Sequence, residues 1–272
     1  MTLLAAPLEA VVAPRAQEKE FRAPGLTIPS LHTPASELSS RLAAQLPDLA
    51  ALGVPAEGAF YDPLAQRWAS LLPTEPLIPG TGVGNPLTWA GLGITGQPTE
   101  AQIKAAAWEA FVAYLQRVQA LGVNVDELSR SPRLAVFEDG AIVQIYVQRV
   151  LAGVPVRDSS ITATINHGNL VLLGLTNWAA ASPVADPSLA AEQARAVVAA
   201  HASPRLFTAT DKPRLEFVPY APSGDARQNG YEYRLVWVVD GTTGTDRASW
   251  EGLVDAASGE LLAFQDKNQY VS

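Results

Sequence analysis

The sequence contains no cysteine, which excludes disulfide bonds, thiolate nucleophiles and cysteine-based zinc sites. It also has no uninterrupted run of eighteen or more apolar residues, so no transmembrane helix is expected. Basic residues are few and do not cluster. The chain carries 19 Lys and Arg against 27 Asp and Glu, a formal net charge of −8. We therefore do not expect a nucleic acid or an anionic membrane as its partner.

Histidine is scarce, and the chain lacks the strings that usually mark an active site. The three histidines are His32, His167 and His201. None stands in an HExxH string and no two lie four residues apart, so the usual helical zinc pair is excluded. No GxSxG elbow occurs, and the glycines from Gly80 to Gly84 follow no apolar strand and open no helix. We therefore expect no catalytic residue, no metal, no cofactor and no enzymatic activity.

Residues 1–98 are rich in proline and glycine, and we expect an irregular segment with one short helix. That helix is predicted from Pro34 to Leu46, with Thr33 as its N-cap. The first dozen residues are apolar, but they lack the basic stretch of a signal peptide. No clear export signal is therefore predicted in this chain.

A long amphipathic helix is predicted after Thr99. Thr99 and Gln102 have the spacing of a capping box, and Gly122 supplies a left-handed residue at the other end. Between them apolar residues recur at intervals of three and four along one face. This stripe consists of Ile103, Ala107, Phe111, Tyr114, Val118 and Leu121.

The pattern changes at Arg133 to alternating β-branched residues, which predicts antiparallel strands with a hairpin turn between Asn166 and Asn169. The order then repeats, with a helix predicted from Asp186 to His201 and three further strands. We therefore predict an α+β fold with two consecutive helix-plus-antiparallel-sheet modules. The predicted boundaries are 1–98 for the N-terminal segment, 99–182 for the first module and 183–272 for the second.

Two stretches of the sequence resemble known families. VQIYVQRVLAGVPVRDSSITATINHGNLVLLGL resembles the core of the fungalysin/thermolysin propeptide (FTP) domain. PSLAAEQARAVVAA, YEYRLVWVV and VDAASGELLAFQDKNQ together resemble a PepSY domain, with Ser258 in place of the usual threonine. The similarity covers about residues 99–270 and implies cystatin-like modules. The matching residues are Arg149, Gly153, Val154, Pro155, Val156, Gly168, Asn169 and Leu170 in the first stretch, and Asp255, Ala256, Ser258, Gly259, Glu260, Leu261 and Leu262 in the second.

The resemblance implies a role rather than a reaction. Such modules precede secreted zinc metalloproteases, template the folding of the protease and occupy its cleft. It implies a thermolysin-like metalloprotease as the partner, in trans or formerly in cis, and a secreted or cell-envelope location. The chain stops where such a protease would begin. The residues expected to contact the protease form the C-terminal tail: Asp266, Lys267, Asn268, Gln269, Tyr270, Val271 and Ser272.

Three other interpretations stay open. The chain could be a stand-alone secreted or envelope binding module whose specific part is residues 1–98, or a remnant of a larger protease precursor. It could also be a hydrolase whose site follows no known string.

For the motif glycines the simplest interpretation is structural, since tight turns require them. Trp178, Trp237 and Trp250 are most simply side chains of the sheet-face core. The sequence does not give the oligomeric state.

Overall fold

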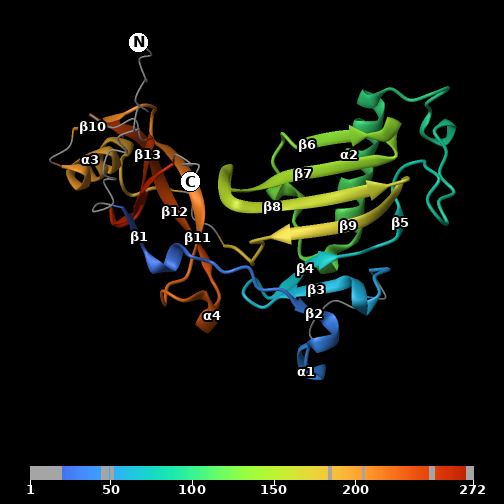
Figure 1. Cartoon of the computed structure of the whole chain (residues 1–272), viewed down its shortest axis with the longest axis horizontal. Helices are drawn as coiled ribbons and strands as arrows, with labels where there is room; N and C mark the ends of the chain where they lie inside the picture. The colour runs from blue at the N-terminus through green and yellow to red at the C-terminus, as the bar shows by residue number, and fades with distance from the viewer. Residues whose placement is uncertain are drawn as a thin grey trace, which may run out of the picture.

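The computed structural model describes residues 20–43, 49, 52–182, 186–203, 206–244 and 249–267. The predicted α+β class is confirmed, because a few helices pack on a large, mostly antiparallel sheet. Figure 1 shows two lobes, one built around α2 and the other around α3. The candidate contact residues Asn268, Gln269, Tyr270, Val271 and Ser272 lie outside the described residues.

The N-terminal third, which we expected to be irregular, contributes strands to both lobes. Thr33 pairs with Tyr61 and Pro34 with Phe60, so these residues are extended and do not begin a helix as predicted. Proline is tolerated there because the strand lies at a sheet edge. Helix α1 covers only Ser40–Ala43 of the predicted span, and 44–46 lie outside the described residues. The strands are β1 (Phe21–Arg22), β2 (Thr33–Pro34), β3 (Ala59–Asp62), β4 (Arg67–Leu71) and β5 (Glu75–Pro76).

The first lobe contains the long helix that the sequence predicts. Helix α2 (Glu100–Arg117) begins at a capping box, in which the Thr99 hydroxyl accepts from the Gln102 N–H and the Gln102 side chain accepts from the Thr99 N–H. A 3-10 turn (Gln119–Leu121) follows, and Gly122 ends it with φ of +66°. The expected helix is therefore confirmed, with its last turn tightened.

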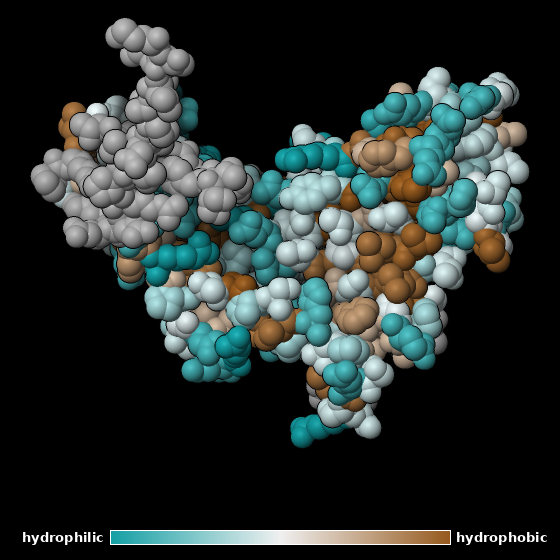
Figure 2. All heavy atoms as spheres, in the orientation of Figure 1, coloured by the Kyte–Doolittle hydropathy of each residue, from teal (hydrophilic) through white to brown (hydrophobic). Residues whose placement is uncertain are grey.

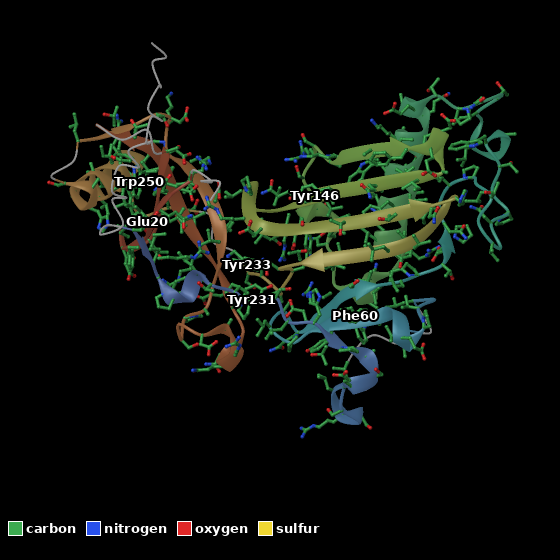
Figure 3. The ribbon with its side chains drawn as sticks, viewed as in Figure 1. Glu20, Phe60, Tyr146, Tyr231, Tyr233 and Trp250 are labelled. Carbon is green, nitrogen blue, oxygen red and sulfur yellow. The ribbon has the colours of Figure 1, made fainter. Side chains whose placement is uncertain are left out.

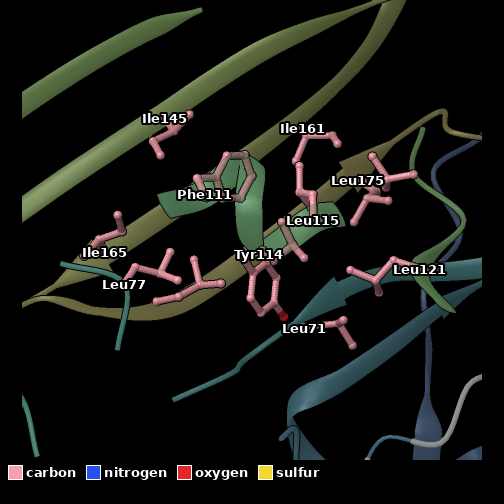
Figure 4. Packing of buried hydrophobic residues seen from close by; sticks show 14 of the residues in the cluster. Leu71, Leu77, Phe111, Tyr114, Leu115, Leu121, Ile145, Ile161, Ile165 and Leu175 are labelled. Atoms are coloured by element: carbon pink, nitrogen blue, oxygen red, sulfur yellow. The ribbon is translucent and has the colours of Figure 1, made fainter. Parts of the chain in front are cut away.

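Helix α2 packs across one face of the first sheet. The sheet order is β6-β7-β8-β9-β4-β3-β2, and β5 also pairs with β9. Phe111, Tyr114 and Leu115 of the helix are buried among aliphatic side chains of the strands (Figure 4). The central strands are β6 (Arg133–Phe137), β7 (Ile142–Leu151), β8 (Val154–Asn166) and β9 (Asn169–Thr176).

The second lobe repeats the plan with a smaller helix. Helix α3 (Ala191–Ala202) begins five residues later than predicted, because the N–H groups of Ser188 and Leu189 bond the Ala256 carbonyl instead of opening a helix. Ala194 and Val198 pack on Trp250, which is buried as expected. The sheet order is β1-β14-β13-β12-β11, with β10 also on β12. The elements are β10 (Phe207–Ala209), β11 (Arg214–Tyr220), α4 (Ala226–Asn229), β12 (Glu232–Thr243), β13 (Ser249–Asp255) and β14 (Leu261–Asp266).

The two sheets meet where β8 and β11 run parallel. Phe217 of β11 pairs with Val156 of β8, and both side chains are buried in a small cluster with Leu151. The sequence pattern predicted only antiparallel pairing, because no helix alternates with the strands. This parallel contact joins strands of different lobes, so the connection between them contains the whole of β9 and α3.

Candidate functional site

The first site is a buried arginine at the junction of the lobes. Arg149 is the second-to-last inward-facing residue of β7, and its side chain is 2% exposed. Its Nε and Nη2 lie 2.8 and 2.7 Å from the Glu127 carboxylate. Its Nη1 donates to the Ala179 carbonyl and to the Tyr233 hydroxyl, both at 2.8 Å. The guanidinium also lies over the rings of Trp178 (4.6 Å) and Tyr233 (5.0 Å). One side chain thus links both sheets and the connection between them.

Two tyrosines and a second arginine surround this group. Tyr233 lies in β12 and Tyr231 lies in the loop just before it, and their rings pack edge-to-face. Figure 3 shows both tyrosines between the lobes. Burial raises the pKa of both phenols, so they stay neutral hydrogen-bonding groups. Burial and the positive charge of Arg149 lower the pKa of Arg67, which donates to the Gly122 carbonyl at 3.0 Å. The junction therefore holds two cations close together, with Glu127 as the carboxylate paired to Arg149.

The remaining motif residues of the first stretch shape turns and the start of β8. Gly153 has φ of +83° in the tight turn between β7 and β8. Val154 and Pro155 pair with Leu151 and Val150, and Val156 is fully buried at the parallel contact with the other lobe. These positions therefore build the junction itself.

The Gly168-Asn169-Leu170 turn is covered by the loop after β5. A Cβ on Gly168 would lie 2.4 Å from the Ile78 carbonyl oxygen, and its φ is +87°. Asn169 is 6% exposed and donates to the Val83 carbonyl, while Leu170 is fully buried. The glycine-rich loop that includes Gly82 thus packs on this hairpin, since the Gly82 N–H bonds the His167 carbonyl at 2.7 Å.

The second motif stretch also forms a turn. The Asp255 carboxylate accepts from the N–H groups of Ala257 and Ser258 at 2.9 and 2.8 Å, an Asx-type turn. Gly259 follows with φ of +78° and donates its N–H to the Asp255 carbonyl. Glu260 is exposed, and its N–H bonds the Ser258 hydroxyl. Ser258 therefore stabilises the turn twice, through its N–H to Asp255 and through its hydroxyl to the Glu260 N–H.

A second site is an ion network on the face of the second sheet opposite α3. Arg157 of β8 bonds Glu216 of β11 at 2.7 Å and Glu251 of β13 at 2.6 Å, so the network also joins the lobes. Burial alone would lower the pKa of Arg157, but the hydrogen bonds that it donates to these carboxylates, and their negative charges, raise it. Arg214 extends the network to Glu216 and to Asp240 of β12.

The described part of the candidate tail ends in this network. The Lys267 ammonium lies 3.1 Å from the Asp240 carboxylate and 3.7 Å from Glu251, and its backbone N–H bonds the Ser249 carbonyl at 2.7 Å. Burial would raise the pKa of Asp240, but the hydrogen bonds and charges of Arg214 and Lys267 lower it. Asp266 precedes this anchor as the last residue of β14.

A third feature is the face of the first sheet opposite α2, which we call the open face. Gln144, Tyr146, Thr162 and Thr164 point outward there, and Figure 2 shows hydrophobic and near-neutral residues over much of this face. A shallow cavity of about 410 Å³ opens on it. Its lining is Arg133, Leu134, Ala135, Gln144, Ile145, Tyr146, Thr162, Ala163, Thr164 and Leu172.

Sequence reasoning had singled out Arg149 only through the family motif, and it missed the partners that give the residue its role. The strand parity offered a signal, because Val143, Ile145 and Val147 face the core and Arg149 follows in the same phase. Among the described residues, no group of three or more histidine, aspartate or glutamate side chains is arranged to hold a metal ion. Within the same residues, no helix is long and apolar enough to cross a membrane.

Comparison with known proteins found similarity at the level of structure alone. No family model matches the chain, and no curated protein matches it. A solved structure that does match is the Bacillus megaterium YpeB C-terminal domain, with a TM-score of 0.32 and 12% identity over 78% of this chain and 82% of that one. At this TM-score the likeness says nothing of activity or partner.

Proposed function

We propose that this protein is a non-catalytic, propeptide-like partner of a thermolysin- or fungalysin-type zinc metalloprotease, in which an FTP-like module is followed by a PepSY-like module. It assists the folding of the protease, inhibits it, or does both, in a secreted or cell-envelope setting. A domain that binds the native protease stabilises it by mass action, and a segment laid in the cleft denies entry to substrate.

The observation that carries the proposal is the anchoring of Lys267. Three interactions hold this residue at the end of β14: the ion pairs to Asp240 and Glu251 and the backbone bond to Ser249. Lys267 and Asp266 are the first two of the proposed contact residues, and the other five, 268–272, follow directly in the sequence. A contact segment that starts from a fixed point loses less conformational freedom on binding than one that starts from a free chain end.

The motif residues support the proposal in a second way. Arg149 and Val156 fasten the first module to the second, and Arg157 adds an ion pair from β8 to β13. Because the two modules are joined at three points, the anchored end of β14 keeps a constant position relative to the open face. A protease could then contact both modules at once.

The test is inhibition of a purified thermolysin-like protease, titrated with the intact protein and with a variant that ends at Lys267. This truncation keeps every described residue of β14 and its anchor, so it removes only residues 268–272 of the proposed contact segment. We expect the truncated form to lose at least tenfold in inhibition while its thermal unfolding stays unchanged. The same pair of proteins is then added to the denatured protease, and recovery of activity on refolding measures the chaperone role.

A matched pair of lysine variants tests the anchor. Lys267→Ala is expected to weaken inhibition by no more than about thirtyfold, because its two ion pairs are partly exposed and each contributes about 0–1 kcal/mol. Lys212→Ala removes an exposed lysine that lies outside the ion network, and it should leave inhibition unchanged. The proposal fails if the intact protein neither inhibits nor refolds any protease of this class.

A second candidate function is a binding module that uses the open face. The cavity of about 410 Å³ and its uncharged lining, apart from Arg133, favour it. Deleting residues 1–98 would not test this function cleanly, because Tyr61, Trp68 and Leu71 belong to the core of the first lobe. In the same titration, Tyr146→Glu should abolish binding through the open face and truncation after Lys267 should not. The reverse result favours the tail.

A further inference from the structure

Strand β6 forms a free edge of the first sheet. It pairs with β7 from Arg133 opposite Tyr146 to Phe137 opposite Ile142. In an antiparallel pair, only every second residue directs its N–H and C=O at the neighbouring strand, so the alternate groups of β6 point away from the sheet. Among the described residues, the elements with the most extensive contacts to β6 are β7, α2 and the 3-10 turn Glu138–Gly140 that follows β6. Figure 1 shows β6 at the rim of its lobe.

Unlike the two-residue edge strands, β6 has no protection at its centre. Strands β1, β2 and β5 have two residues each, and the last two end in Pro34 and Pro76. Strand β6 has five residues, and Leu134, Ala135 and Val136 at its centre carry no charge and no proline. Natural sheets usually block an edge of this kind with a charge, a proline or a bulge, because it can pair with another strand.

The charges beside β6 have opposite signs at its two ends. Arg130 and Arg133 lie at the beginning, Glu138 and Asp139 at the end, and all four residues are exposed. If two copies of β6 run antiparallel, the basic end of each lies beside the acidic end of the other, and this contact forms twice about one two-fold axis. Parallel pairing would place like charges together. The charges therefore complement a second copy of the same strand in one orientation.

We propose that the protein self-associates into a two-fold dimer in which β6 pairs antiparallel with β6 of a second copy, centred on Ala135. The small Ala135 side chains then lie opposite each other, and Phe137 of each copy faces Arg133 of the other. Phe137 is 48% exposed, and the dimer covers it. The two open faces become one continuous surface. Because five residue pairs bury less area than a standard interface, the dimer is weak and depends on concentration. The proposal does not depend on the proposed function.

The experiment is sedimentation of the intact chain over a concentration series up to about 1 mM. One variant carries R130E and R133E, and a second carries E138R and D139R. Each alone should be monomeric, because its two copies would place like charges together. An equimolar mixture should restore a dimer, since both contacts then join opposite charges. R195E combined with R227E makes the same change of charge at exposed positions outside β6, and it should sediment like the unmodified chain.

The possible results divide as follows. Loss of the dimer in each variant, with restoration in the mixture, supports the pairing. An unmodified chain that stays monomeric throughout the series overturns the proposal. A dimer that survives both charge reversals shows that β6 is not its interface. Loss in each variant without restoration in the mixture contradicts the antiparallel arrangement. Far-UV circular dichroism and thermal unfolding check that every variant is folded.

Discussion

Replacing Arg149 by alanine is expected to reduce the free energy of unfolding by about 3–5 kcal/mol, the range for removing one partner of a buried ion pair. The structure gives the reason. The substitution leaves the Glu127 carboxylate without the two nitrogens at 2.7 and 2.8 Å, and it leaves the Ala179 carbonyl without its donor. It also removes the cation from between the rings of Trp178 and Tyr233.

One further variant separates the charge of Arg149 from its geometry, and another is a control at an exposed arginine. Arg149→Lys keeps the positive charge but cannot form the two-pronged contact with Glu127 or stack between the rings. We expect it to cost about 1.5–3 kcal/mol, the range for a lost charge-assisted hydrogen bond. Arg133→Ala is the matched control. Arg133 is exposed on the same sheet, and its cation–π contact with the Tyr146 ring, at 5.4 Å, is worth no more than about 1 kcal/mol at an exposed site, so its removal should cost no more than that.

Urea unfolding, followed in parallel by tryptophan fluorescence and far-UV circular dichroism, measures these differences. Trp178, one of six tryptophans, lies against Arg149, so part of the fluorescence signal reports on the junction. The two signals should coincide for the unmodified chain. In Arg149→Ala they should separate if the lobes come apart before they unfold. A loss below about 1 kcal/mol, with coincident transitions, would refute the view that this side chain holds the lobes together.

Three other outcomes follow from the structure. Because the cationic partners of Asp240 lower its pKa in the folded state, its contribution to stability is present at neutral pH and is lost as pH falls below its ordinary value of 3.8. Asp240→Asn should therefore flatten the acid side of a plot of urea midpoint against pH. Gly168→Ala should destabilise the protein by several times the roughly 1 kcal/mol expected for Gly153→Ala. Both residues have positive φ, but only the Cβ at Gly168 would meet the Ile78 carbonyl oxygen, at 2.4 Å. Thr99→Ala should cost about 1 kcal/mol in thermal unfolding, and equal stability would show that the capping box contributes nothing.

The elements that could be predicted from the sequence are those that local chemistry determines. The capping box of α2 needs only Thr99 and Gln102, three positions apart. The turn between β8 and β9 needs only His167 and Gly168, which both adopt positive φ. The residues that make up each signal lie within a few positions of one another, so the sequence alone predicts these elements.

The parts that could not be predicted depend on distant partners. Strand β2 forms because Thr33 pairs with the distant Tyr61. The local sequence around Pro34 instead predicts the first residue of a helix. The role of Arg149 depends on Tyr233, which is 84 positions away. The network at Lys267 likewise assembles from four strands, and no short string reveals which carboxylates will meet there.

The pairing of β1 with β14 has a consequence for how the protein folds. Arg22 bonds Gln265, although 243 positions separate them, and Phe21 lies opposite Phe264. Bringing such distant residues together costs about 5 kcal/mol of chain entropy, so this contact should form late. During synthesis, β1 is made first and would stay unpaired until β14 emerged. A nascent chain would therefore have to keep β1 accessible throughout synthesis. The pairing of β1 with β14 would be the last step in forming the second sheet.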